Sequence, residues 1–119
     1  MIIGIGCDIV DIYRVTNAME KGHMQRILTQ KEQACCAHMQ SKRKAEWIAG
    51  RFAGKEAIYK ALSAHCNVSL CDIEILSDAH GAPYCTMETY DIQISIAHEH
   101  DYAIAYAIVQ SKEMDDSCL

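Results

Sequence analysis

The chain has 119 residues, 50% hydrophobic and 23% charged, so it is long enough to bury one core and too short for two ordinary domains. Its net charge of -5 argues against a general nucleic-acid binder, because phosphate contacts need a basic surface. Its seven cysteines include no C-x-x-C pair and suit neither a zinc ribbon nor a secreted disulfide framework. Without a signal peptide or a membrane-spanning apolar run, we expect one cytoplasmic domain over residues 1–119.

The first predicted element is a strand over residues 2–12, IIGIGCDIVDI, in which Ile and Cys alternate with Gly and Asp. One face of this strand is fully apolar. Cys7 lies on that face and is most simply a small hydrophobic residue of the core. Asp8 shares the opposite face with Gly4 and Gly6, where another group can approach the backbone closely.

Three helical segments are predicted next. The first covers about residues 13–19 and ends before Gly22. The second begins at Thr29, which precedes Glu32 by three residues as in a capping box. The third is a long helix over about residues 43–64, built of strong helix formers through most of its length.

Beyond the long helix the sequence period changes to two. Four short strands are predicted, at residues 72–76, 82–87, 92–98 and 102–109, with turns at SDAHGAP and HEHD. This order predicts an α+β fold, an antiparallel sheet with helices packed on one side. The tail, SKEMDDSCL, is polar and is predicted to fray.

The long helix carries charges although it is apolar on nearly every side. On a helical wheel, Glu56 falls between Phe52 and Ala49, and Lys60 falls between Ala49 and Ala53. A helix that is apolar all round is a central one. Its charges must therefore be paired, bind a metal or bind a ligand, because an unpaired buried charge costs several kcal/mol.

Two interpretations of these charges remain open. In the first, Glu56 and Lys60, four residues apart, pair with each other. That leaves Arg51 and Lys55 without a partner, so the second is a site for a polyanionic phosphate ligand, with Glu56 reserved for a divalent metal. Mg²⁺ prefers one or two carboxylates plus phosphate oxygens and water. Asp8, at the glycine-lined end of the first strand, supplies the second carboxylate.

Six sequence blocks, taken together, resemble one known family. They are GIGCDIVDIYRV, RILTQKE, KRKAEWIAGRFAGKEAIYKAL, DIEI, DAHGAPY and SIAHEHDYAIA, and they run in order along nearly the whole chain. The combination resembles the small bacterial 4'-phosphopantetheinyl transferases, the holo-[acyl-carrier-protein] synthases. The resemblance implies transfer of phosphopantetheine from coenzyme A to a serine of apo-acyl carrier protein, releasing adenosine 3',5'-bisphosphate, in support of fatty acid biosynthesis.

The resemblance also implies roles for particular residues. Asp8 and Glu56 would hold Mg²⁺ at the coenzyme A pyrophosphate and act in catalysis with Lys60, which contacts the phosphates. A metal ion, two carboxylates and a lysine are the types of group that phosphoryl transfer requires. Glu56 is the first candidate for the base that takes the serine proton. Further contacts with coenzyme A are implied for Lys42, Arg43, Arg51 and His98.

The implied partners are coenzyme A, the carrier protein and further copies of this chain. Arg14, on the first helix, would contact the acidic recognition helix of the carrier protein, and Lys21 and Arg26 would extend this basic strip. Docking is therefore expected to depend on salt. The family is a homotrimer with active sites between subunits. We expect neither nucleic acid nor membrane among the partners.

Three departures from the family pattern bear on coenzyme A binding. SAHCNVSL replaces a glycine-containing turn after the long helix, Ala82 removes a cation, and Glu99 places a negative charge beside His98. We expect these changes to weaken coenzyme A binding without abolishing it.

Two functions of other classes stay open. One is a non-catalytic coenzyme A or carrier-protein binding module of the same fold, against which the joint presence of Asp8, Glu56 and Lys60 argues. The other is a structural oligomer with a buried ion-pair network. A metal pair of His98 and His100 is a weaker hypothesis than a strand-end and a turn histidine.

Overall fold

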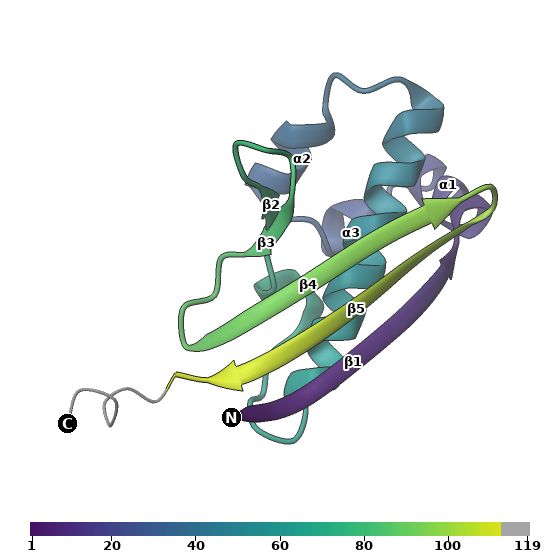
Figure 1. Ribbon diagram of the computed structural model, residues 1–119. Coiled ribbons are helices and arrows are strands. Elements are labelled where there is room, and N and C mark those ends of the chain that lie inside the picture. Colours follow the sequence, from purple (N-terminus) through teal and green to yellow (C-terminus); the bar gives the residue numbers. More distant parts are fainter. Residues whose placement is uncertain (113–119) are drawn as a thin grey trace.

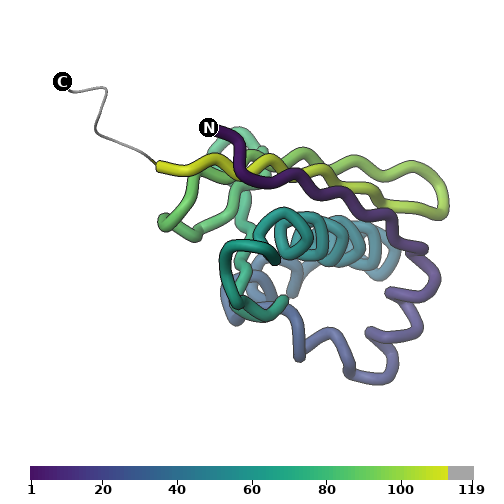
Figure 2. The backbone as a smooth tube through the Cα atoms, turned by 90° about the horizontal axis from the view of Figure 1, so that it is seen from below, coloured from purple at the N-terminus to yellow at the C-terminus, as the bar shows by residue number. Residues whose placement is uncertain are grey.

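A three-stranded antiparallel sheet lies against one long central helix in the computed structural model, which describes residues 1–112 (Figure 1). The sheet has the order β1 (Ile2–Asp11), β5 (Tyr102–Ser111), β4 (Tyr90–Glu99), and the central helix is α3 (Ser41–Leu62). All helices lie on one side of the sheet (Figure 2). The predicted α+β fold is therefore confirmed. Most of the polar tail lies outside the described residues.

The first helix follows β1 without a loop. α1 (Ile12–Glu20) is capped by Asp11, whose carboxylate accepts a hydrogen bond of 2.9 Å from the N–H of Tyr13. The helix ends before Gly22, which has a φ of 74° that favours glycine. A short 3₁₀ helix, η1 (His23–Arg26), comes next and was not predicted. No helix within residues 1–112 is long and apolar enough to cross a membrane.

The second helix and a small β-ribbon cover the side of α3 that faces away from the sheet. α2 (Gln30–Cys36) begins with the predicted capping box. β2 (Ile75–Ser77) and β3 (Pro83–Cys85) pair only with each other, so the strands after α3 do not form one continuous sheet. The 3₁₀ helix η2 (Leu70–Asp72) occupies the start of the first strand predicted in this region.

The glycine face of β1, and not its apolar face, packs on α3. A Cβ atom on Gly4 would lie 2.0 Å from the carbonyl oxygen of Ala61, and one on Gly6 would lie 1.9 Å from that of Ala57. Both distances are far below a normal van der Waals contact, so any side chain here would push the helix off the strand. The group that approaches the glycines is therefore the backbone of α3.

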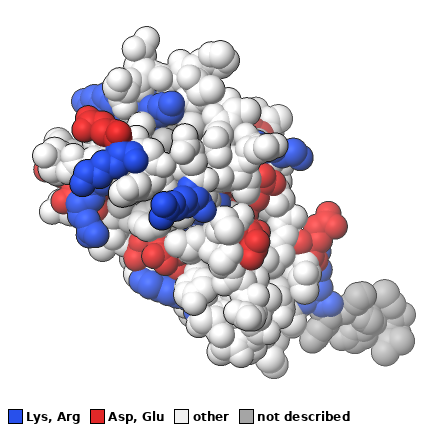
Figure 3. Space-filling model, turned by 180° about the vertical axis from the view of Figure 1, so that it is seen from behind, with Lys and Arg blue, Asp and Glu red and all other residues white. Residues whose placement is uncertain are grey.

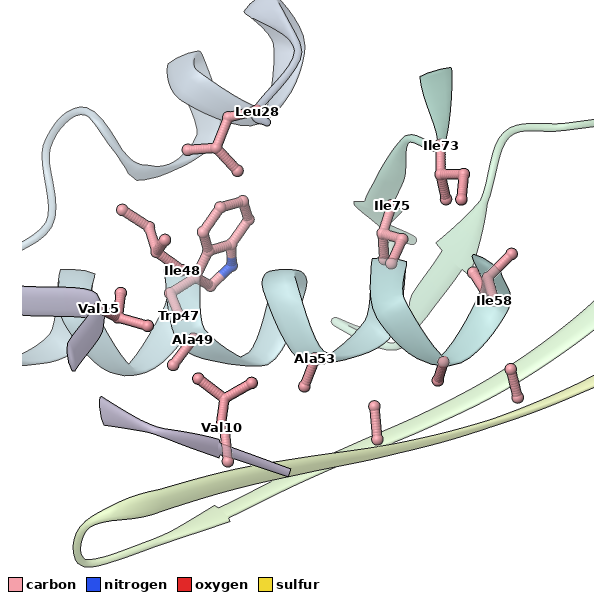
Figure 4. Packing of buried hydrophobic residues seen from close by; sticks show 14 of the residues in the cluster. Val10, Val15, Leu28, Trp47, Ile48, Ala49, Ala53, Ile58, Ile73 and Ile75 are labelled. Atoms are coloured by element: carbon pink, nitrogen blue, oxygen red, sulfur yellow. The ribbon is translucent and has the colours of Figure 1, made fainter. Parts of the chain in front are cut away.

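Alanines complete this close contact between helix and sheet. Figure 4 shows Ala49 and Ala53 of α3 facing the sheet, with Leu28 and Ile75 on the opposite side of the helix. The alanines of β5 and α3 that meet here are at most 1% exposed, namely Ala103, Ala105, Ala107, Ala49, Ala53 and Ala57. Because small side chains let the helix axis lie near the sheet, the bulky core residues gather on the far side of α3.

The apolar face of β1 consequently points away from the core. Ile5 is 68% exposed and Ile9 is 62% exposed, and the prediction that Cys7 belongs to the core is wrong, because Cys7 is exposed on the same face. β5 continues this surface, since Tyr106 pairs with Cys7 and Ile108 with Ile5. The two strands thus present a row of bulky apolar side chains to solvent.

Candidate active site

The site forms where β1 passes over α3. Asp8 follows Gly6 on the helix-facing side of the strand, so the close glycine contact brings its carboxylate to the helix surface. Lys60 reaches it from α3, with its Nζ 3.0 Å from Asp8 Oδ1 and 3.0 Å from the carbonyl oxygen of Cys7. The hydrogen bond and the charge of Asp8 raise the pKa of Lys60. Lys60 therefore pairs across to the strand, and not with Glu56 on its own helix.

Glu56 lies one helical turn before Lys60 and is half-buried. Loss of water around its carboxylate raises the pKa of Glu56, and the negative charge of Asp8 raises it further, against a smaller opposing effect of Lys60. Two carboxylates thus lie close enough to repel each other while one lysine compensates only in part. A divalent cation between them would relieve this repulsion.

The donor set fits Mg²⁺. Within residues 1–112, no group of three or more His, Cys, Asp and Glu side chains is placed to hold a metal ion. Two carboxylates alone would leave most of an octahedral shell to water and phosphate oxygens, which is how Mg²⁺ is usually bound beside a phosphorylated substrate. Asp8 and Glu56 are accordingly the residues that would hold it.

Asp8 and Glu56 line a hollow of about 440 Å³ between β1, α1 and α3, here called the carboxylate hollow. Arg14 of α1 lines the same hollow, so the structure brings one predicted docking residue to the predicted metal ligands. Apolar side chains form much of its wall, namely Val15, Ala18, Met24, Ile27 and Phe52. His23 also lines it and was missed by the sequence analysis, because no period or motif revealed η1.

The other predicted coenzyme A contacts lie away from this hollow within one chain. Lys42 and Arg43 occupy the first turn of α3, and the 13 residues from Arg43 to Glu56 span about 20 Å of helix. His98, at the end of β4, lines a separate hollow at the β4–β5 turn together with its neighbour Glu99. One chain by itself therefore does not unite these groups.

The predicted docking strip has two further residues, which lie at and beyond the C-terminal end of α1. Lys21 caps the C-terminal end of α1, and Arg26 lies in η1; both are exposed. Neither lines the carboxylate hollow.

Lys55 has a structural partner that the sequence did not reveal. Its Nζ lies 2.7 Å from Glu32 Oε1, and both side chains are fully buried. It also donates to the carbonyl oxygens of Leu70 and Ile73, while Glu32 Oε2 accepts a hydrogen bond of 2.7 Å from the N–H of Ile75. Lys55 therefore joins α3, α2 and the segment before β2, and needs no phosphate ligand.

Arg51 is also satisfied inside the chain. Its Nε donates to the carbonyl oxygen of Ile75 at 3.2 Å and its Nη2 to Ser77 Oγ at 2.7 Å. The guanidinium carbon lies 4.3 Å from the ring centroid of Trp47, within cation–π range. The argument that Arg51 lacked a partner is thus wrong, and its contact with coenzyme A stays a prediction from the resemblance.

The loop that replaces the family's glycine-containing turn is attached to β1. His65 Nε2 lies 3.0 Å from the carbonyl oxygen of Ile3. The same loop, with Tyr59 of α3, surrounds a small hollow at the C-terminal end of the helix. The side chains of SAHCNVSL are therefore accommodated without disturbing the glycine contact of β1.

Comparison with known proteins agrees with this geometry. Residues 4–107 match the family described as the 4'-phosphopantetheinyl transferase superfamily. The chain belongs to this superfamily.

Relatives in the superfamily match almost end to end. A holo-[acyl-carrier-protein] synthase of Anoxybacillus flavithermus is 44% identical over 116 residues, covering 92% of this chain and 97% of that protein. A holo-[acyl-carrier-protein] synthase of Oceanobacillus iheyensis is 39% identical over 119 residues, covering 95% of this chain and 100% of that protein. A solved structure of the Bacillus anthracis synthase in complex with CoA (3',5'-ADP) has a TM-score of 0.86 at 36% identity, covering 94% of this chain and 99% of that one.

Proposed function

We propose that this protein is a holo-[acyl-carrier-protein] synthase. It transfers 4'-phosphopantetheine from coenzyme A to a serine of apo-acyl carrier protein and so serves fatty acid biosynthesis. The observation that carries the proposal is the pair of facing carboxylates, Asp8 and Glu56, with Lys60 beside them, at one end of a hollow in a chain of this superfamily. The proposal includes one domain over residues 1–119, acting in the cytoplasm.

Catalysis relies on charge placement. Asp8 and Glu56 would hold Mg²⁺, which would supply positive charge for the pyrophosphate of coenzyme A. Lys60 contacts the phosphates with an ammonium group that Asp8 already orients, and its charge offsets the negative charge that develops on the leaving group. Positioning and charge neutralisation of this kind account for most of phosphoryl transfer.

The bond changes of the reaction are simple. The serine oxygen forms a bond to the phosphorus that carries pantetheine, and the bond from that phosphorus to the bridging oxygen breaks, so adenosine 3',5'-bisphosphate leaves. The serine loses its proton, for which Glu56 is the proposed acceptor.

The carrier protein is proposed to dock on the helical side of the molecule. Its proposed contacts are Arg14, which lines the carboxylate hollow, and Lys21 and Arg26, which are exposed at and beyond the C-terminal end of α1. On this side, Lys and Arg atoms are interspersed with Asp and Glu and do not form one broad basic surface (Figure 3). A short basic strip on an acidic protein would give an association that weakens with salt.

A homotrimer with active sites between subunits completes the proposal. The outer face of the sheet exposes Ile5, Ile9, Tyr102, Tyr106 and Ile108. A contiguous apolar surface on a sheet marks an interaction surface, and copies of this chain are its proposed occupant. Association would also allow the basic start of α3 or the β4–β5 turn of one subunit to reach the carboxylate hollow of another, which a single chain does not achieve.

The test is intact mass spectrometry of a bacterial apo-acyl carrier protein incubated with this protein, coenzyme A and Mg²⁺. We expect the carrier protein to gain one phosphopantetheine, and expect the gain to vanish with EDTA or with Glu56→Ala. If several carrier proteins gain no mass while coenzyme A still binds, the alternative, a non-catalytic coenzyme A or carrier-protein binding module of this fold, replaces the proposal.

A further inference from the structure

Lys60 supplies the positive charge that faces the two carboxylates of the candidate site. Its Nζ lies 3.0 Å from Asp8 Oδ1 and 3.0 Å from the carbonyl oxygen of Cys7, so both hydrogen bonds go to β1. The side chain of Lys60 is 52% exposed and that of Asp8 is 19% exposed. Because an ion pair with this much solvent around it is weak, Lys60 can exchange Asp8 for another partner at little cost.

The two hydrogen bonds of Lys60 differ in how easily they are given up. The Cys7 oxygen belongs to the backbone of β1, which lies directly on α3 at Gly4 and Gly6. Asp8 Oδ1 belongs to a side chain, which can take another partner. An ammonium group has three N–H donors, so Lys60 can turn from Asp8 to a new acceptor while its bond to Cys7 keeps it at the site.

Lys60 is also a partial counter-charge for Glu56. Burial raises the pKa of Glu56 and the charge of Asp8 raises it further, whereas Lys60 acts in the opposite direction. One ammonium group thus compensates two carboxylates in part. A cation bound by the same carboxylates would be repelled by Lys60, because like charges interact strongly at short range in a partly buried site.

We propose that Lys60 is an internal counter-ion that opposes the binding of Mg²⁺ to the protein alone and gives way when coenzyme A arrives. This inference rests on the proposed function, in which Asp8 and Glu56 hold Mg²⁺ and Lys60 contacts the phosphates. It gives Lys60 a second task, which is to make the binding of metal and coenzyme A cooperative.

The phosphates of coenzyme A supply what Lys60 needs in order to leave Asp8. Their oxygens accept hydrogen bonds from its ammonium group, and their negative charge offsets the repulsion between the ammonium group and the metal. Such coupling is reciprocal, so coenzyme A and Mg²⁺ tighten each other's binding by the same factor. Lys60 contributes to that factor in addition to the direct bond between metal and phosphate.

The first test is isothermal titration calorimetry of Mg²⁺ into the protein without coenzyme A. We expect Lys60→Met to lower the Kd of Mg²⁺ by about 10-fold, because it removes the competing charge and keeps an unbranched side chain. Circular dichroism checks that the variant is folded. Should Lys60→Met fail to fold, Lys60→Gln removes the same charge. An unchanged or higher Kd of Mg²⁺ in a folded variant would overturn the inference.

Arg14→Met is the matched control. Arg14 lines the same carboxylate hollow, but within residues 1–112 it has no hydrogen bond or ion pair with Asp8 or Glu56. Removal of its charge should change the Kd of Mg²⁺ by no more than about threefold. Equal effects of Arg14→Met and Lys60→Met would show that Mg²⁺ responds only to the total charge of the hollow, which refutes a specific role of Lys60.

The second test measures the coupling itself. The Kd of coenzyme A is determined by calorimetry in EDTA and in Mg²⁺, and the ratio of the two values is the coupling factor. Lys60→Met weakens coenzyme A binding under both conditions, but it should also lower the coupling factor by at least about threefold. A coupling factor equal to that of the wild type would show that Lys60 opposes the metal equally with and without phosphates, and the proposed cooperativity would be wrong.

The mass-spectrometry assay separates this inference from the proposed function. If the wild type transfers phosphopantetheine but Lys60→Met does not tighten Mg²⁺ binding, only the counter-ion role is disproved. If Lys60→Met tightens Mg²⁺ binding and lowers the coupling factor while no carrier protein gains mass, the counter-ion role stands and the transferase proposal fails.

Discussion

Glu56 and Lys55 are adjacent in the sequence, yet they have opposite roles. Lys55 points to the far side of α3 and is fully paired with Glu32. Glu56 faces β1, where Asp8 repels it and Lys60 is already bonded to Asp8. A carboxylate whose pKa is raised by burial and by a neighbouring carboxylate marks a candidate functional site, which is the physical reason for proposing Glu56 as a metal ligand.

Glu56→Gln should stabilise the protein in EDTA at pH 7.5 and lower phosphopantetheine transfer by at least about 100-fold. The pKa of Glu56 is raised in the folded state, so folding is favoured with the proton bound and disfavoured once it is lost. The wild type therefore loses stability relative to Glu56→Gln as the pH rises from about 4.5 through the raised pKa. Thermal unfolding against pH measures this difference.

Mg²⁺ should reverse the order of stability of the wild type and Glu56→Gln. It should raise the Tm of the wild type and leave that of Glu56→Gln nearly unchanged, because a cation that binds only the native state stabilises it. Glu88→Gln, at an exposed position, is the control and should follow the wild type throughout. A lower Tm for Glu56→Gln than for the wild type in EDTA would contradict the assignment.

At the scale of elements, one ion pair joins three parts of the chain. Glu32 lies on α2, Lys55 lies on α3, and the N–H of Ile75 on β2 donates to the same carboxylate. Glu32 also accepts from the N–H of Thr29 and so completes the helix cap. The pair therefore fixes α2 and the β2–β3 ribbon on α3.

Lys55→Met should lower the free energy of unfolding by about 3–5 kcal/mol, since it leaves the carboxylate of Glu32 buried without a counter-charge. Urea unfolding followed by circular dichroism measures the change. Lys31→Met, at an exposed position on α2, should alter it by no more than about 0.5 kcal/mol. Equal effects of the two substitutions would show that the buried pair has no special structural role.

At the scale of the whole molecule, the outer face of the sheet is apolar over β1 and β5, and nothing within residues 1–112 covers it. Gly4, Gly6 and the alanines of β5 form the face against α3. The bulky side chains of β1 and β5 lie on the other face. This arrangement explains why a chain of this size leaves several large hydrophobic residues more than half exposed, and it supports the proposed trimer.

Tyr106→Asp should convert the proposed trimer to monomers and abolish transfer, because it places a charge at the centre of the outer sheet face. Light scattering after size-exclusion chromatography gives the mass, and the transfer assay gives the activity. Tyr84→Asp, on β3 at a comparably exposed position, should leave both unchanged. A Tyr106→Asp protein that remains a trimer would show that the subunits associate through another surface.

The sequence predicted the elements well where local patterns determine them. The capping box of Thr29 and Glu32, the two-residue period of β4 and β5, and the long helix α3 all appear as expected. α3 is not buried on every side, however, because Tyr59 and Lys60 are exposed. η1 and η2 were missed because a single turn of 3₁₀ helix has no repeating pattern that a sequence reveals. The resemblance identified the family because its blocks cover nearly the whole chain.

By itself the sequence determined the fold class, the family and the residues at which the chemistry is proposed, because these depend on patterns along the chain. The tertiary structure decided which charges are paired and which face of β1 is buried. Partners such as Lys55 and Glu32 lie 23 residues apart, and only packing brings them together. The glycine face of β1 is the buried one because the backbone of α3 lies too close to it for any side chain. No local sequence pattern encodes this close approach.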